Sequence, residues 1–152
     1  MEFLGLGLYM ISACVAATLI WHDGSPIEAL VHAHPLTKRM LMGTVIGLTI
    51  VSIIYSPLGK RSGGHINPAM TLTFWWLGKI KPWDVVFYIT AQFLGAVAGV
   101  WLSSLLLTNS LADPAVNYVV TEPGSAGILI AFVAEFATVS YTHLTLPTIC
   151  SV

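Results

Sequence analysis

The chain has 152 residues, of which 56% are hydrophobic and 9% are charged, and its formal net charge is −1. A soluble domain of this size carries roughly 25% charged residues to cover its surface, so the composition excludes an ordinary soluble domain. The near-neutral charge, with no basic patch, also argues against a nucleic-acid partner. We therefore expect an all-α, multi-pass integral membrane protein embedded in the lipid bilayer.

Long apolar stretches in the sequence predict the membrane spans. A polar, Pro-containing loop at 22–37 separates the first two stretches, and the turn residues Ser56-Pro57-Leu58-Gly59 end the second. The third begins at Pro82. We predict about four spans, at residues 3–21, 40–55, 82–107 and 125–140.

A short helix is predicted between the second and third spans. Asn is a favoured helix N-cap and Pro is favoured at the first helical position, so Asn67-Pro68 indicates a helix start. The helix is expected at about 68–77, which is roughly half the length needed to cross a bilayer. A half-helix that begins with free N–H groups at membrane depth can contact a polar molecule inside the lipid. The alternative is an ordinary capped loop outside the membrane.

The basic residues orient the chain. Lys60, Arg61, Lys79 and Lys81 flank the short helix, whereas the opposite side has Lys38 and Arg39. The positive-inside rule then places the N-terminus in the cytoplasm. We expect the chain to reside in the plasma (inner) membrane.

Two pairs of glycines at helical spacing predict close helix contacts. Gly43 and Gly47 lie in the second span, and Gly95 and Gly99 lie in the third. Small residues four apart let membrane helices approach closely. The alternative is that Gly is simply common in membrane helices.

Four motifs in order resemble one family. The run Gly63-Gly64-His65-Ile66-Asn67-Pro68-Ala69-Met70-Thr71 resembles the first Asn-Pro-Ala box of the major intrinsic proteins, the aquaporins and glycerol facilitators. Similar matches occur at Glu2-Phe3-Leu4-Gly5, at Ala91-Gln92-Phe93-Leu94-Gly95-Ala96 and at Ala134-Glu135-Phe136. The resemblance covers roughly residues 2–140.

The resemblance implies two inverted repeats, each with three spans and one re-entrant half-helix, in a homotetramer with one pore per subunit. The chain would hold the first repeat and the start of the second, as a partial channel domain over residues 1–140. It would be part of a passive channel for water or small neutral solutes such as glycerol. The sequence has one Asn-Pro-Ala box and no filter Arg, so we expect a fragment that does not conduct alone. The alternative is a non-functional truncated membrane protein.

The resemblance also implies the site residues. Asn67, Pro68 and Ala69 form the pore box, in which the Asn67 amide donates a hydrogen bond without carrying a charge. Glu2, Gln92 and Glu135 brace the re-entrant loops. The constriction position falls at Ile46 or Gly47. Neither residue is aromatic, so the resemblance also allows a pore wide enough for glycerol. The pore-lining carbonyls are those of Gly63, Gly64, His65 and Ile66.

Three further interpretations remain open. The Thr-rich residues 141–152 depart from the family pattern, and Pro147 would disrupt a helix, which indicates a non-native tail. An intramembrane enzyme could use Ser62 and His65, but no orienting third group is evident. His32 and His34 could bind metal, although a solvated loop is the better interpretation and we predict no metal or cofactor.

Overall fold

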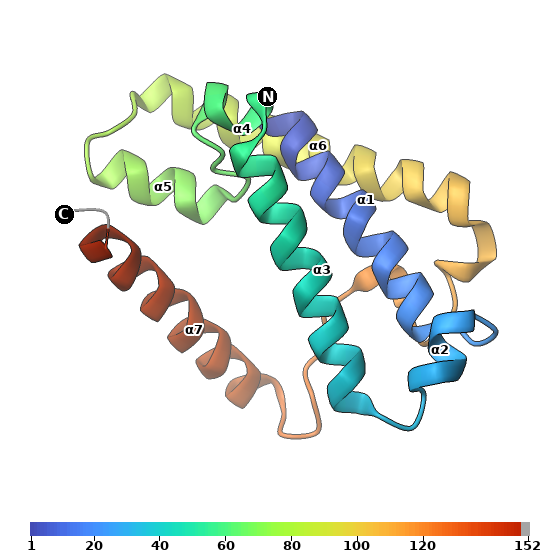
Figure 1. Cartoon of the computed structure of the whole chain (residues 1–152). Coiled ribbons are helices and arrows are strands. Elements are labelled where there is room, and N and C mark those ends of the chain that lie inside the picture. Colours follow the sequence, from blue (N-terminus) through green and yellow to red (C-terminus); the bar gives the residue numbers. More distant parts are fainter. Residues whose placement is uncertain (150–152) are drawn as a thin grey trace. The chain divides into compact units, whose positions relative to one another are not determined.

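A computed structural model describes the backbone of residues 1–149 and the side chains of residues 1–140. Within these limits the chain contains helices and no strand (Figure 1). It divides into two compact units, residues 1–120 and residues 121–152, which are described separately.

The first unit contains three long apolar helices and several short ones. Glu2–Trp21, Pro35–Tyr55 and Pro82–Ser110 are long and apolar enough to cross a membrane. The prediction of an all-α membrane protein is therefore confirmed. The elements are α1 (Glu2–Trp21), α2 (Pro26–Val31), α3 (Pro35–Tyr55), α4 (Pro57–Ser62), α5 (Pro68–Trp76), α6 (Pro82–Leu107), η1 (Thr108–Ser110) and η2 (Asn117–Val119).

Helix α1 packs along both α6 and α3, and its contact with α6 is the closer one (Figure 1). A Cβ atom at Gly95 would collide with the Phe3 carbonyl oxygen, and one at Gly99 would lie 2.6 Å from the Gly7 carbonyl oxygen. Lipid tails are as apolar as the helices, so such close backbone packing holds the pair together. The predicted pair at Gly43 and Gly47 makes no such contact, because a Cβ there would meet nothing within 4 Å.

Two segments that the sequence predicted as loop or turn are short helices in the structure. Helix α2 lies within the predicted loop at 22–37, and α4 replaces the turn predicted after the second span. Each follows a Ser-Pro pair: Ser25 accepts a hydrogen bond from Ile27 N, and Ser56 accepts one from Leu58 N. Ser as N-cap and Pro at the first helical position start a helix as readily as they mark a turn. Helix α3 likewise begins at a proline, Pro35, rather than at Met40.

The segment after α6 folds back onto the end of α1. Leu111 and Val116 are buried against Cys14 and Ala17 of α1. The His22 ring Nδ1 lies 2.6 Å from the Asp113 carboxylate. The end of α1 at His22 and the segment from Thr108 to Val120 are thus joined by both apolar and polar contacts.

The second unit contains α7 (Ile128–Ile149). The helix begins at Ile128 rather than at Ser125, after Gly127 with a positive φ of 91°. Its backbone remains helical across Pro147, contrary to the expected disruption, because α7 extends to Ile149. Residues 150–152 lie outside the described residues, and a non-native origin for residues 141–152 stays a prediction.

Candidate functional site: a braced loop and short helix

The half-helix α5 starts at a well-formed N-cap. Asn67 has extended backbone, and its side-chain Oδ1 accepts a hydrogen bond from Ala69 N at 2.8 Å. Pro68 occupies the first helical position. The Asn67 residue is exposed, and because its oxygen is used in the cap, its NH₂ group is the part that remains to donate outward.

The loop before α5 has an unusual backbone. Gly63, Gly64 and Ile66 have φ values of +85°, +60° and +42°. Glycine adopts this left-handed region readily, but a β-branched residue such as Ile66 is strained there. Such strain persists only where surrounding contacts fix the conformation. The Ile66 N–H is fixed by a hydrogen bond of 2.7 Å to Glu2.

The Glu2 carboxylate is the centre of these contacts. It is buried, and it lies at the first turn of α1, where the helix dipole favours a negative group. Four donors surround it and use both of its oxygens. They are the Ser62 hydroxyl at 2.6 Å, His65 N at 3.2 Å, Ile66 N at 2.7 Å and Gln92 Nε2 at 2.7 Å.

A second cluster of hydrogen bonds surrounds Thr71, beside the Glu2 carboxylate. The Thr71 hydroxyl is fully buried, donates to the Asn67 carbonyl at 3.2 Å and accepts from Gln92 Nε2 at 3.1 Å. The His65 Nδ1 lies 3.1 Å from the same oxygen. Because the single hydroxyl proton goes to Asn67, we infer that His65 Nδ1 carries a proton and donates. Gln92 therefore joins α6 both to Glu2 and to the half-helix.

Aromatic rings hold the His65 side chain. The Phe74 ring stacks on it at a centroid distance of 4.8 Å, and the Tyr88 ring meets it edge-on at 5.2 Å. The Tyr88 hydroxyl also donates to the Ser62 carbonyl at 3.0 Å. Sequence reasoning did not select Phe74 or Tyr88. A signal for Tyr88 was present, because it lies four residues before Gln92 and so shares its face of α6.

The contacts do not favour the enzyme alternative. The Ser62 hydroxyl donates to Glu2, and the His65 ring contacts Thr71 rather than Ser62. A nucleophile and its base need a direct hydrogen bond or a close approach. The two residues therefore act as parts of the loop's hydrogen-bond network.

The predicted constriction residues lie away from this network. Ile46 is half-buried and Gly47 is exposed, both on α3. At 100° per residue, Gly43 and Gly47 fall on the face of α3 opposite to Val45 and Thr49. The latter face is turned toward α1, as shown by the Ser12–Thr49 hydrogen bond of 2.7 Å.

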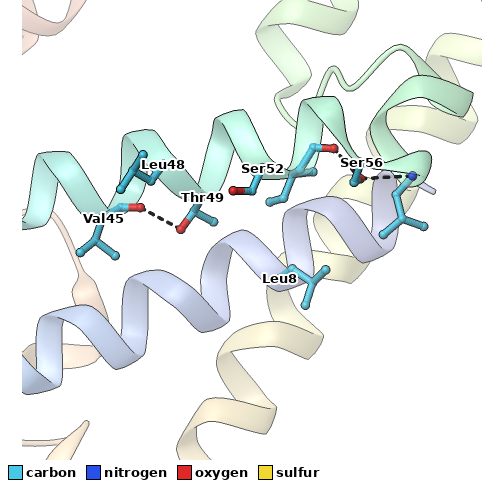
Figure 2. Close-up of a pocket in the computed structure, with 8 residues that line it drawn as sticks. Leu8, Val45, Leu48, Thr49, Ser52 and Ser56 are labelled. Atoms are coloured by element: carbon cyan, nitrogen blue, oxygen red, sulfur yellow. Dashed lines mark hydrogen bonds between the residues drawn. The ribbon is translucent and has the colours of Figure 1, made fainter.

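A groove on the α1-facing side of α3 is a separate feature (Figure 2). It has a volume of about 460 Å³. Figure 2 shows that the Thr49 hydroxyl is bonded to the Val45 carbonyl, so it is satisfied by its own helix. The Ser56 hydroxyl is likewise bonded to the Ile53 carbonyl. Neither Ile46 nor Gly47 lines the groove, which is bounded by Leu8, Val45, Leu48, Thr49, Ser52, Ile53, Ser56 and Leu58.

The three remaining predicted residues, Glu135, His32 and His34, are all exposed. Glu135 lies on α7 in the second unit, so its bracing role stays a prediction. Among the described residues, no group of three or more His, Cys, Asp or Glu side chains is placed to hold a metal ion.

The fold and the site together define a class: an all-α membrane protein in which a strained loop and a short capped helix are braced by a buried carboxylate. Comparison with known families then identifies the family to which the chain belongs. Residues 1–149 match the family model described as Major intrinsic protein. The chain belongs to the major intrinsic protein family.

Individual relatives agree with this assignment. The chain is 37% identical to Aquaporin-5 of Rattus norvegicus over 117 residues, which cover 74% of the chain and 43% of the relative. It is 30% identical to Probable aquaporin NIP7-1 of Arabidopsis thaliana, over 90% of the chain and 44% of the relative. A shorter match, 48% identical over 38% of the chain, is to Probable aquaporin AqpM of Archaeoglobus fulgidus, of which it covers 23%. The chain thus spans less than half the length of these relatives. No solved structure matches it significantly.

Proposed function

We propose that these residues form the N-terminal part of a passive transmembrane channel for water and small neutral solutes. The observation that carries the proposal is the Asn67 N-cap of α5, held in place through Glu2 and Gln92. Family membership and the names of the aquaporin relatives support it.

The chemistry of the loop suits a neutral permeant. The first turn of α5 has N–H groups without helical partners, which give that end a partial positive charge. The Asn67 NH₂ group can orient a water or hydroxyl oxygen without binding it as tightly as a charged group would. The carbonyls of residues 63–66 supply acceptors along the path. Positive potential at this point disfavours the passage of cations and protons.

The glycine face of α3 favours a wide pore. If this face lines the lumen, Gly47 contributes no side chain to the constriction, and a Cβ at Gly43 or Gly47 would meet nothing within 4 Å. Pore diameter is one of the terms that set selectivity for neutral solutes. Glycerol is therefore proposed as a permeant in addition to water.

The proposed orientation in the membrane rests on the positions of the Lys and Arg residues, and the proposed oligomeric state rests on the family resemblance. Four of the six Lys and Arg residues flank α5, so we propose that this end faces the cytoplasm and that the protein resides in the plasma membrane. We also propose a homotetramer with one pore per subunit, as the family resemblance implies. The 152 residues contain one Asn-Pro-Ala box, so we expect them not to conduct selectively alone.

Stopped-flow light scattering on proteoliposomes tests the proposal. The sample is a longer chain in which these residues are followed by a second repeat with its own Asn-Pro-Ala box, and the 152-residue chain is the comparison. We expect raised water and glycerol permeability for the longer chain and no rise for the shorter one. Unchanged permeability with well-folded longer protein would overturn the proposal.

A further inference from the structure

The turn between α5 and α6, residues 77–81, is compact, contains two Lys residues and is flanked by Trp residues. Helix α5 ends at Trp76 and α6 begins at Pro82. Gly78 takes a positive φ of 68°, and Lys79 N donates to the Phe74 carbonyl at 2.9 Å, which closes the helix end. The turn leads directly into the span Pro82–Ser110. Because a candidate span begins at Pro82, we expect the turn at the level where a membrane changes from hydrocarbon to headgroups.

Three indole side chains surround this turn. Trp76 is 91% exposed, Trp83 is 75% exposed and Trp75 is 46% exposed. Trp75 and Trp76 also line a hollow of about 380 Å³. Exposed Trp side chains at the end of a span are typical of the membrane–water interface, where the ring is apolar and its N–H is polar.

The charges at this end are mostly positive and unpaired. Lys79 and Lys81 are exposed, and neither takes part in an ion pair within the described part of the chain. The Tyr88–Ser62 hydrogen bond brings the end of α4, with Lys60 and Arg61, to the same end of the bundle. The acids here are Asp84, which is exposed, and Glu2, whose carboxylate is buried and fully hydrogen-bonded.

The other end of the bundle has a different charge balance. Its Lys38 is tied to Glu28 at 2.9 Å, and Asp113 is tied to His22. Asp23 adds a further negative charge, against Arg39. The two ends therefore differ in what they can attract from a bilayer.

We propose that the α5–α6 turn, with Trp75, Trp76 and Trp83, binds the headgroups of anionic phospholipids. Lys79 and Lys81 supply the charge that is complementary to a lipid phosphate, and the indoles pack beside the acyl chains. Bilayer lipid is the occupant because the turn joins a membrane span and combines exposed aromatic and basic groups at one level.

Tryptophan quenching by brominated lipids tests this on the 152-residue chain. Trp21 and Trp101 are replaced by Phe, so that the measured fluorescence comes only from the three indoles at the turn. The chain is placed in vesicles that mix phosphatidylcholine with brominated phosphatidylglycerol, and in matched vesicles with brominated phosphatidylcholine. We expect the relative binding constant to favour phosphatidylglycerol by at least about fivefold, the factor that one of the two lysines near an anionic surface supplies.

Charge variants decide whether the turn is responsible. In Lys79→Gln/Lys81→Gln the preference should fall severalfold, with Lys60 and Arg61 left to supply what remains, whereas Lys79→Arg/Lys81→Arg should keep it. The variant Lys38→Gln/Arg39→Gln removes the same charge from the opposite end and should also keep the preference. Equal quenching by both lipids in the parent chain, or equal losses in both Gln variants, would overturn the proposal. Helix content by circular dichroism checks that each variant is folded. The readout is lipid binding, so it is independent of any result on permeability.

Discussion

The Gln92 side-chain nitrogen lies 2.7 Å from a Glu2 carboxylate oxygen, so a residue at the start of α1 and one near the middle of α6 hold the same loop. The other Glu2 contacts go to Ser62, His65 and Ile66. The position of the half-helix therefore depends on a carboxylate 60 or more residues away in sequence.

Changing Glu2→Gln should destabilise the chain by about 3 kcal/mol. The amide removes one acceptor and turns a donor toward the donors of Ser62, Ile66 or Gln92, which leaves buried polar groups unpaired. Thermal unfolding in detergent measures the loss, and hydrogen exchange of residues 63–66 should rise with it. The control is Glu28→Gln, which breaks the ion pair with Lys38 and should cost less than about 1 kcal/mol. Equal effects of the two changes would contradict the bracing role.

Changing Gly95→Ala should destabilise the α1–α6 contact by about 1–3 kcal/mol. The added methyl group would collide with the Phe3 carbonyl oxygen, which is backbone and has no room to turn aside. Gly47→Ala is a matched control in another apolar helix, because a Cβ there meets nothing within 4 Å. It should change stability by less than about 1 kcal/mol, in the stabilising direction. A small effect at Gly95 would contradict the close helix packing.

The pH dependence of stability should include a contribution from Asp113. The Ala115 backbone N–H and then the His22 side chain hold the pKa of this carboxyl below its ordinary value of 3.8. A lowered folded pKa means that the stabilisation is present above pH 3.8 and is lost as the pH falls through the folded value.

Unfolding temperatures of the parent chain and of Asp113→Asn should therefore differ most near neutral pH. The difference should shrink as the pH is lowered below 3.8. In His22→Ala, which removes one of the two main causes of the lowered pKa, the loss on acidification should be smaller and should end nearer to the ordinary value. A difference that grows on acidification would have the wrong sign for this account.

Much of the fold followed from elementary patterns in the sequence. Uncharged apolar runs indicated the spans, and the Asn67-Pro68 pair indicated where α5 starts. The contacts of Glu2 were expected only through the family resemblance, because sequence distance gives no measure of which loop a carboxylate reaches. The left-handed conformation of Ile66 was not predictable, since β-branched residues disfavour it.

The short helices show a second limit. Ser-Pro at residues 25–26 and 56–57 marks a helix start or a turn equally well, and only the following backbone decides between them. The residues between the predicted spans at 82–107 and 125–140 carried no structural prediction, yet Leu111 and Val116 are buried. A single Leu or Val carries no periodicity, so burial of this kind depends on tertiary packing.

Selectivity should respond to the size of residue 47. In the longer chain with a second repeat, Gly47→Phe should narrow the pore and lower the ratio of glycerol to water permeability by about tenfold, a barrier change of about 1.4 kcal/mol. Leu48→Phe, which adds an aromatic ring on the groove side of α3, is the control and should leave the ratio unchanged. If both variants change the ratio alike, Gly47 does not face the lumen. Stopped-flow measurements with an osmotic step in each solute give the ratio.

The most direct test of the channel account is the measurement of water flux and proton flux together for the longer chain and for its Asn67→Asp variant. Asp caps a helix as well as Asn does, so α5 should still form, but the added negative charge cancels the positive potential at its N-terminus. The account predicts retained water flux and a proton flux raised by at least about tenfold, equivalent to a barrier lower by about 1.4 kcal/mol. An unchanged proton flux in folded protein would contradict the claim that Asn67 lies at the pore.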